Sequence, residues 1–134
     1  MKKISLLFLV MFLALVITEI GHAQSSPVKM NEIQSRGVAG DLDWIELYNS
    51  SSSPVNISGY RIYDVGGQGK TKPKKPFPAG TIIPAKGFYV IITDTASFAG
   101  DLSGFGLSSS GETVWLEDTT TTTIIDTVTF GATA

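Results

Sequence analysis

Short β-rich runs separated by turn residues are the feature that most constrains the fold of this chain. From Val28 onward, runs of β-branched and aromatic residues alternate with clusters of Gly, Pro, Asn, Asp and Ser. Apolar residues do not recur at helical spacing for more than a turn or two, so the pattern is typical of an all-β sandwich or barrel. We predict strands near Val28–Gln34, Leu42–Tyr48, Val55–Ile57, Tyr60–Asp64, Gly80–Ile83, Phe88–Thr93, Thr113–Glu117 and Ile124–Phe130.

The second run shows the two-residue period of a strand with one buried face. Ile45 and Leu47 fall on one face, and Trp44, Glu46 and Tyr48 fall on the other. The first face is predicted to join the core. The second is predicted to be aromatic but partly polar.

Two later runs predict strands with different degrees of burial. The run Phe88–Ile92 is apolar on both faces, which predicts a central strand covered on both sides and among the most buried segments. In Thr113–Glu117, Trp115 falls on the opposite face from the apolar residues, so this strand is expected to be half-exposed. Trp115 is therefore a candidate surface or interface residue.

The N-terminal residues have the order of a secretory signal peptide. Lys2 and Lys3 precede an apolar run from Ile4 to Ile17, and small residues lead up to Ala23. The run is shorter than the roughly 20 residues that cross a bilayer as a helix, so no permanent membrane anchor is expected. We predict a signal peptide at 1–23 and a domain at 24–134, exported to the periplasm, the cell surface or the medium.

Composition excludes several kinds of chemistry from the predicted domain. The chain has no cysteine, and its one histidine, His22, lies in the predicted leader. Structural zinc and Ser-His-Asp or Cys-His catalysis therefore lack their usual residues, and no cofactor or metal is expected. Without the leader the net charge is −3, from eight basic and eleven acidic residues, which disfavours a nucleic-acid partner.

Seven short motifs, in one order, cover nearly the whole predicted domain. They are Asn31–Ile33, Asp43–Asn49, Val55–Tyr60, Ile82–Phe88, Gly104–Leu107, Gly111–Leu116 and Ile125–Gly131. In this order they resemble the lamin tail domain family of bacterial secreted proteins. The resemblance implies an immunoglobulin-like β-sandwich of about 7–9 short strands, used for interaction or targeting without a catalytic site. Relatives commonly continue beyond the position of Ala134, so the domain is also expected within larger polypeptides.

A basic segment and an aromatic set are the candidate binding residues. Lys70, Lys72, Lys74 and Lys75 lie within six residues and could contact phosphate or an anionic polymer such as an acidic polysaccharide. The alternative, which we favour, is a solvated loop stiffened by proline. Trp115, together with aromatic residues elsewhere, could form an exposed platform for a macromolecular partner.

Acidic residues allow two further interpretations. Glu46, between two aromatic residues, is predicted to be a structural acid that hydrogen-bond donors satisfy. Glu32, Asp41 and Asp43 could join it in binding calcium, but the spacing lacks the order of a calcium loop, and a solvated loop is favoured.

Three functions remain open at this point. The first is a non-catalytic exported module that binds a macromolecule through loops and an aromatic-bearing sheet face. The second is a small hydrolase using two carboxylates, Glu46 with Glu112 or Glu32. The third is a structural spacer or cap of a larger cell-surface protein. A flat aromatic patch would favour the binder, a cleft with two facing acids the enzyme, and a charged surface with neither the spacer.

Overall fold

A computed structural model describes residues 26–35, 42–72, 74, 76–93 and 105–132 of the 134-residue chain. The predicted signal peptide at 1–23 lies outside the described residues, as do Asp41 and Lys75. The predictions for those residues therefore stay predictions.

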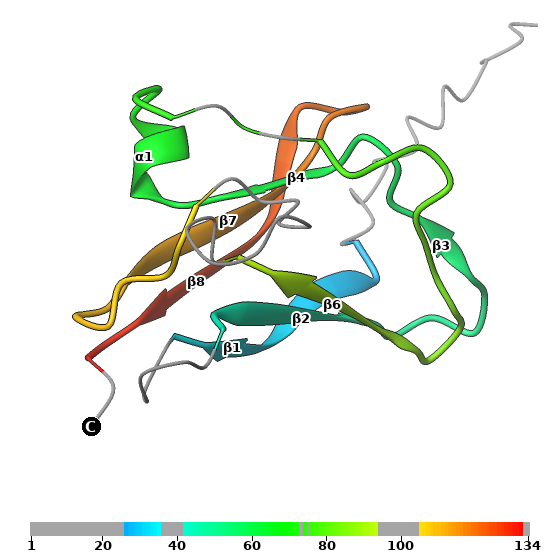
Figure 1. Cartoon of the computed structure of the whole chain (residues 1–134). Helices are drawn as coiled ribbons and strands as arrows, with labels where there is room; N and C mark the ends of the chain where they lie inside the picture. Colours follow the sequence, from blue (N-terminus) through cyan, green and yellow to red (C-terminus); the bar gives the residue numbers. More distant parts are fainter. Residues whose placement is uncertain (1–25, 36–41, 73, 75, 94–104, 133–134) are drawn as a thin grey trace, which may run out of the picture.

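Eight strands and one short helix make up the described chain (Figure 1). In order they are β1 (Val28–Gln34), β2 (Trp44–Asn49), β3 (Val55–Asn56), β4 (Arg61–Tyr63), α1 (Val65–Gln68), β5 (Ile82–Ile83), β6 (Phe88–Ile92), β7 (Glu112–Asp118) and β8 (Thr123–Phe130). Every predicted strand is confirmed, with ends that differ by at most two residues. The four-residue helix α1 was not predicted, because one turn is too short to show a helical period.

Two antiparallel three-stranded sheets form the body of the fold, in the orders β1-β2-β6 and β4-β7-β8. They lie as two layers in Figure 1, with the small β3-β5 sheet at one end and α1 at the other. This arrangement confirms the predicted all-β, immunoglobulin-like sandwich. Two sheets that each bury one face are the usual way for such alternating strands to share a single core.

The core lies between the two sheets and takes alternate residues from each strand. Ile45 and Leu47 of β2 are fully buried, and so are Val114 and Leu116 of β7 in the opposing sheet. Each such side chain contributes roughly 1.5–3 kcal/mol by leaving water. The prediction that the Ile45 face of β2 joins the core is confirmed. With no disulfide in the chain, packing of this kind holds the sandwich together.

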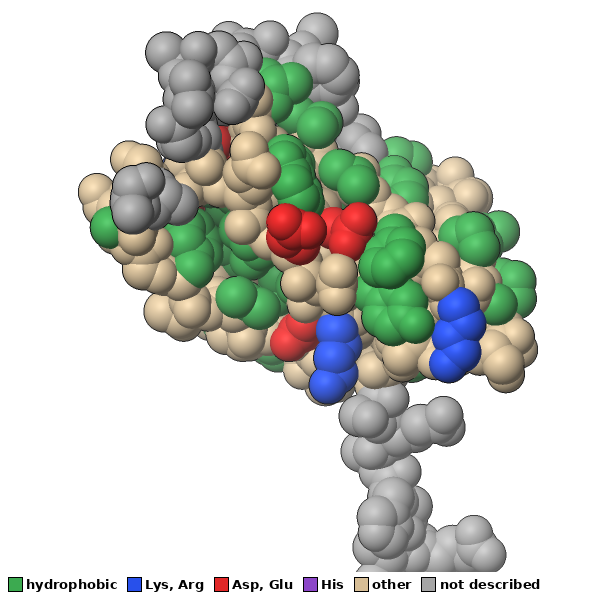
Figure 2. Space-filling model, turned by 90° about the horizontal axis from the view of Figure 1, so that it is seen from below, with side chains coloured by type: hydrophobic (Ala, Val, Ile, Leu, Met, Phe, Trp, Pro, Cys, Tyr) green, Lys and Arg blue, Asp and Glu red, His purple; other side chains and the backbone are tan. Residues whose placement is uncertain are grey.

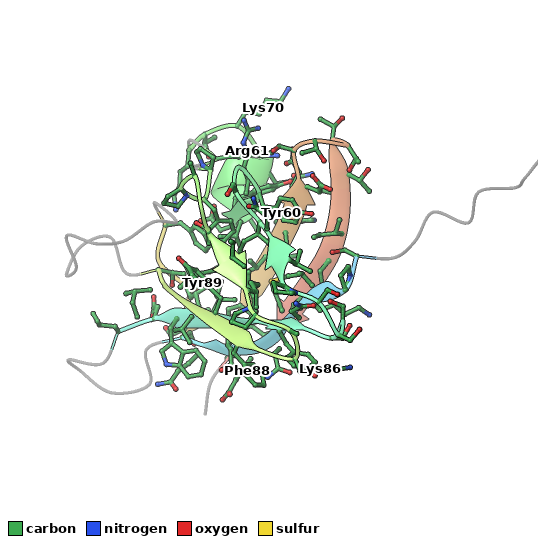
Figure 3. The ribbon with its side chains drawn as sticks, turned by 90° about the vertical axis from the view of Figure 1, so that its right-hand side faces the viewer. Tyr60, Arg61, Lys70, Lys86, Phe88 and Tyr89 are labelled. Atoms are coloured by element: carbon green, nitrogen blue, oxygen red, sulfur yellow. The ribbon has the colours of Figure 1, made fainter. Side chains whose placement is uncertain are left out.

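The prediction that Phe88–Ile92 is covered on both faces is wrong. Among the described residues, β6 pairs only with β2 and forms an edge of its sheet. Ile91 is 1% exposed on the inner face, but Phe88 and Val90 on the outer face are each 52% exposed. Figure 3 shows Phe88 on the outer side of β6 and Tyr89 on the inner side. No described element packs over the outer face, so the apolar run is half-exposed.

Candidate functional site

The outer face of the β1-β2-β6 sheet carries three cross-strand rows of side chains, which we call the outer patch. Strand register defines the rows, because residues directly opposite each other on neighbouring strands share a face. From one end of the patch to the other they are Lys29–Tyr48–Phe88, Glu32–Glu46–Val90 and Gln34–Trp44–Ile92. The β1 side of the patch is polar and the β6 side is apolar.

Aromatic and aliphatic side chains dominate the β6 side. Phe88 and Val90 are exposed, and the ring of Phe88 lies against that of Tyr48, with 4.8 Å between ring centroids. Figure 2, which views the molecule from this side, shows hydrophobic side chains gathered around two adjacent acidic ones. Monomeric domains rarely expose a continuous apolar surface without a function for it, so this patch is the leading candidate site.

An acidic pair occupies the middle row. Glu32 on β1 and Glu46 on β2 lie directly opposite each other. Glu46 is partly buried and accepts a hydrogen bond of 2.8 Å from the Asn31 side-chain amide. The Asn31 amide is a hydrogen-bond donor of the kind predicted for Glu46. Like charges facing across strands are locally destabilising, and no ion pair among the described residues relieves this pair.

Two lysines lie at the Tyr48 end of the patch. Lys29 is exposed in the same row as Tyr48 and Phe88. Lys86 is exposed just before β6, and its ammonium group donates to the Ser50 carbonyl at 2.6 Å. The patch therefore has a basic end and an acidic middle.

Of the predicted basic segment, Lys74 lies elsewhere, over the outer face of the β4-β7-β8 sheet. Lys72 forms an ion pair of 2.8 Å with Asp64, which also caps α1 by accepting from the Gly67 N–H. Lys74 forms an ion pair of 3.2 Å with Glu117. Lys70 is exposed, at the opposite end of the molecule from Phe88 in Figure 3. Two of the four candidate lysines thus have internal partners that would compete with an anionic ligand.

Lys74 also packs against the aromatic residues beneath it. Its ammonium group lies 3.6 Å from the centroid of the Tyr63 ring, and Tyr63 in turn stacks on Trp115 at 6.1 Å. Burial alone would raise the pKa of Glu117, but the neighbouring Tyr63 and Lys74 outweigh it and hold that pKa below its usual value. Trp115 is consequently half-buried beside Tyr63, rather than standing open as a platform.

A pocket of about 330 Å³ opens between the start of β1 and the β7–β8 turn. Its titratable groups are Tyr60 and Asp118, whose hydroxyl and carboxylate are 3.3 Å apart. Burial raises the pKa of Tyr60, and Asp118 raises it further. Burial alone would raise the pKa of Asp118, but hydrogen bonds from Thr120 and Tyr60 outweigh it and lower that pKa. Neither group is tuned to exchange protons near neutral pH, as acid–base catalysis requires.

The remaining described acidic residues, Asp43, Glu112 and Asp126, each accept a hydrogen bond from a backbone N–H group. Asp43 is buried and accepts from the Leu107 N–H at 2.7 Å. Glu112 begins β7 in one sheet, whereas Glu46 lies on the outer face of the other sheet, so these two do not form a catalytic pair. Within the part of the chain that the structure describes, no three acidic, histidine or cysteine residues gather as metal ligands would. No helix in that part is long and apolar enough to cross a membrane.

Comparison with known families agrees with the geometry of the two sheets. The model of the Lamin Tail Domain family matches residues 21–132, which is most of the chain. The chain belongs to the lamin tail domain family. No curated protein matches it. Lamin tail domains have an immunoglobulin-like fold and are generally non-catalytic, and the described residues show no catalytic arrangement.

Sequence reasoning identified the β2 residues of the outer patch of this lamin tail domain, one third of its nine residues. The alternation in β2 places Trp44, Glu46 and Tyr48 on one partly polar face, as observed. It missed Phe88 and Val90, because an unbroken apolar run gives no sign of which face is left uncovered. The lysine at position 86 beside a short turn is typical of an edge strand, but it does not indicate which face of that strand is uncovered.

Proposed function

We propose that this lamin tail domain is a non-catalytic exported module that binds a folded protein through the outer patch. The observation that supports it most is the exposure of Phe88 and Val90, at 52% each, on a strand whose other face lies in the core. Two bulky apolar side chains held rigidly at the surface cost the free protein solubility. Burying these side chains against a partner removes apolar surface from water, which favours binding.

Shape and charge favour a protein surface over other ligands. A sheet face is broad and has no enclosed cavity, which suits another protein better than a small molecule. The acidic pair Glu32 and Glu46 lies within the patch, so an anionic polymer would be repelled there. A partner is expected to have an apolar area and at least one basic group to meet these carboxylates.

The hydrolase, the binding of an anionic polymer and the spacer receive less support from the structure. A carboxylate hydrolase needs two acids facing a substrate in a cleft. Glu46 and Glu112 lie in different sheets, and Glu46 and Glu32, which are opposite each other, lie on the outer face of a sheet. Binding of an anionic polymer by the lysine segment would compete with the ion pairs of Lys72 and Lys74. A spacer needs no exposed aromatic surface. Export follows from the predicted signal peptide at 1–23 and is part of the proposal.

Site-specific photo-crosslinking in the cells that produce the protein tests the proposal. A photoreactive phenylalanine analogue at Val90 should yield one discrete protein adduct, identified by mass spectrometry. The matched control carries the same analogue at Ile124, an aliphatic residue of the other sheet that is 42% exposed. We expect no discrete adduct from position 124, because that surface lies away from the outer patch.

A second substitution checks that the adduct reflects binding by the patch. Adding Phe88→Glu to the protein labelled at position 90 should reduce the adduct at least tenfold, because it places a charge in an apolar contact. An equal yield from positions 90 and 124, or no adduct at 90, would contradict the proposal.

A further inference from the structure

We infer that the partner of the outer patch is a second copy of this chain, packed face to face about a two-fold axis. The inference rests on the proposed function, because it names the protein that covers the patch. The supporting observation is that the first row of the patch, Lys29–Tyr48–Phe88, is complementary to the second, Glu32–Glu46–Val90.

The charges of the first two rows are the first part of this complementarity. Along β1, Lys29 lies in the row next to that of Glu32, and both side chains are exposed. Within the described residues, neither forms an ion pair in its own copy. Strand β1 thus presents one cation and one carboxylate in neighbouring rows, with no ion-pair partner for either among the described residues.

A two-fold axis between the sheets, perpendicular to the strands and midway between these rows, brings the charges together. It lays β1 of each copy over β1 of the other, running in the opposite direction. Lys29 of each copy then faces Glu32 of the other, which forms two equivalent ion pairs. A two-fold interface must be self-complementary in this way, since each contact occurs twice.

The same axis also pairs the uncharged side chains of the two rows. Phe88 of each copy faces Val90 of the other, so the two most exposed apolar residues of β6 cover each other. Tyr48 of each copy faces Glu46 of the other, and its hydroxyl is a suitable donor for that carboxylate. Sheets packed face to face lie about 10 Å apart, a distance that side chains of this size fill.

Charge reversal distinguishes this dimer from any other. Sedimentation equilibrium of the purified full chain measures the dissociation constant of self-association. Lys29→Glu should weaken self-association about tenfold, because two attractive pairs become repulsive; Glu32→Lys should do the same. An equimolar mixture of the two variants should associate within about threefold of wild type, because acidic and basic patches then face each other. The double variant should also recover, and Val90→Arg should remove association.

The outcomes separate failure of the dimer from failure of the proposed function. A wild-type chain that stays monomeric, with an adduct at position 90 to a different protein, overturns the dimer and leaves the binding function standing. A monomer with no adduct at position 90 overturns both. A dimer that is unaffected by Val90→Arg, or that the mixture of charge variants does not restore, also overturns the inferred face-to-face packing.

Discussion

Replacing Asn49 with alanine is expected to lower the free energy of unfolding by about 3–5 kcal/mol, because this side chain is fully buried and joins three segments of the chain. Its amide nitrogen lies 2.8 Å from the Ser53 carbonyl, 3.2 Å from that of Ile83 and 2.9 Å from that of Pro84. Its oxygen accepts from the N–H and the hydroxyl of Ser51. Alanine would remove the bond to the buried Ile83 carbonyl and the part-buried bonds to the carbonyls of Ser53 and Pro84.

Asn56→Ala is the matched control for that experiment. Asn56 also begins an Asn-x-Ser sequence, and its oxygen accepts from the N–H and hydroxyl of Ser58 in the same way, but it is exposed. We expect a loss of about 1 kcal/mol or less, measured like the first by urea unfolding followed by circular dichroism. Equal losses from the two variants would show that Asn49 does not join these segments.

Replacing Gly111 with alanine is expected to cost about 3 kcal/mol or more, because the new methyl group would collide with backbone. Gly111 has φ +89°, and a Cβ there would lie 2.5 Å from the Phe130 carbonyl oxygen and 2.7 Å from the Gly131 carbonyl carbon. Both the positive φ and the end of β8 oppose the substitution. The free energy of unfolding from urea titration measures the loss.

Gly80→Ala separates the collision from the backbone conformation. Gly80 has nearly the same φ, +82°, but a Cβ there would meet nothing within 4 Å. Its loss should be about 1–2 kcal/mol, the cost of a left-handed conformation alone. If Gly111→Ala costs no more than Gly80→Ala, the close packing of the Gly111 turn against the end of β8 is not as described.

The positions of the strands could be predicted from the sequence, because side-chain alternation and turn residues are local properties. The degree of burial of β6 could not be predicted. Its five apolar residues are compatible with a strand covered on both faces and equally with a strand whose outer face is exposed. Only the arrangement of the other elements decides between these two structures. Asn49 could not be recognised either, since the carbonyls of Ile83 and Pro84 lie more than thirty residues away.

The candidate site was predictable only where one strand carried the information. The β2 alternation identified Trp44, Glu46 and Tyr48. Which residues of β1 and β6 lie beside them depends on strand register. The lysine segment is a contrasting case. Its charge density was plain from the sequence, whereas the pairing of Lys74 with Glu117 joins residues 43 positions apart and could not be predicted.

The two tryptophans of the chain provide the most direct test that the outer patch, and not the opposite sheet, is the binding surface. Trp44 lies in the patch and Trp115 on the outer face of β4-β7-β8, so their indole N–H signals in a nitrogen-15 nuclear magnetic resonance spectrum report the two faces separately. The titrant is whichever protein crosslinks to position 90, either the chain itself or another protein. We expect the Trp44 signal to shift and the Trp115 signal to stay; a shift of Trp115 alone, or of neither, would contradict the proposed binding surface.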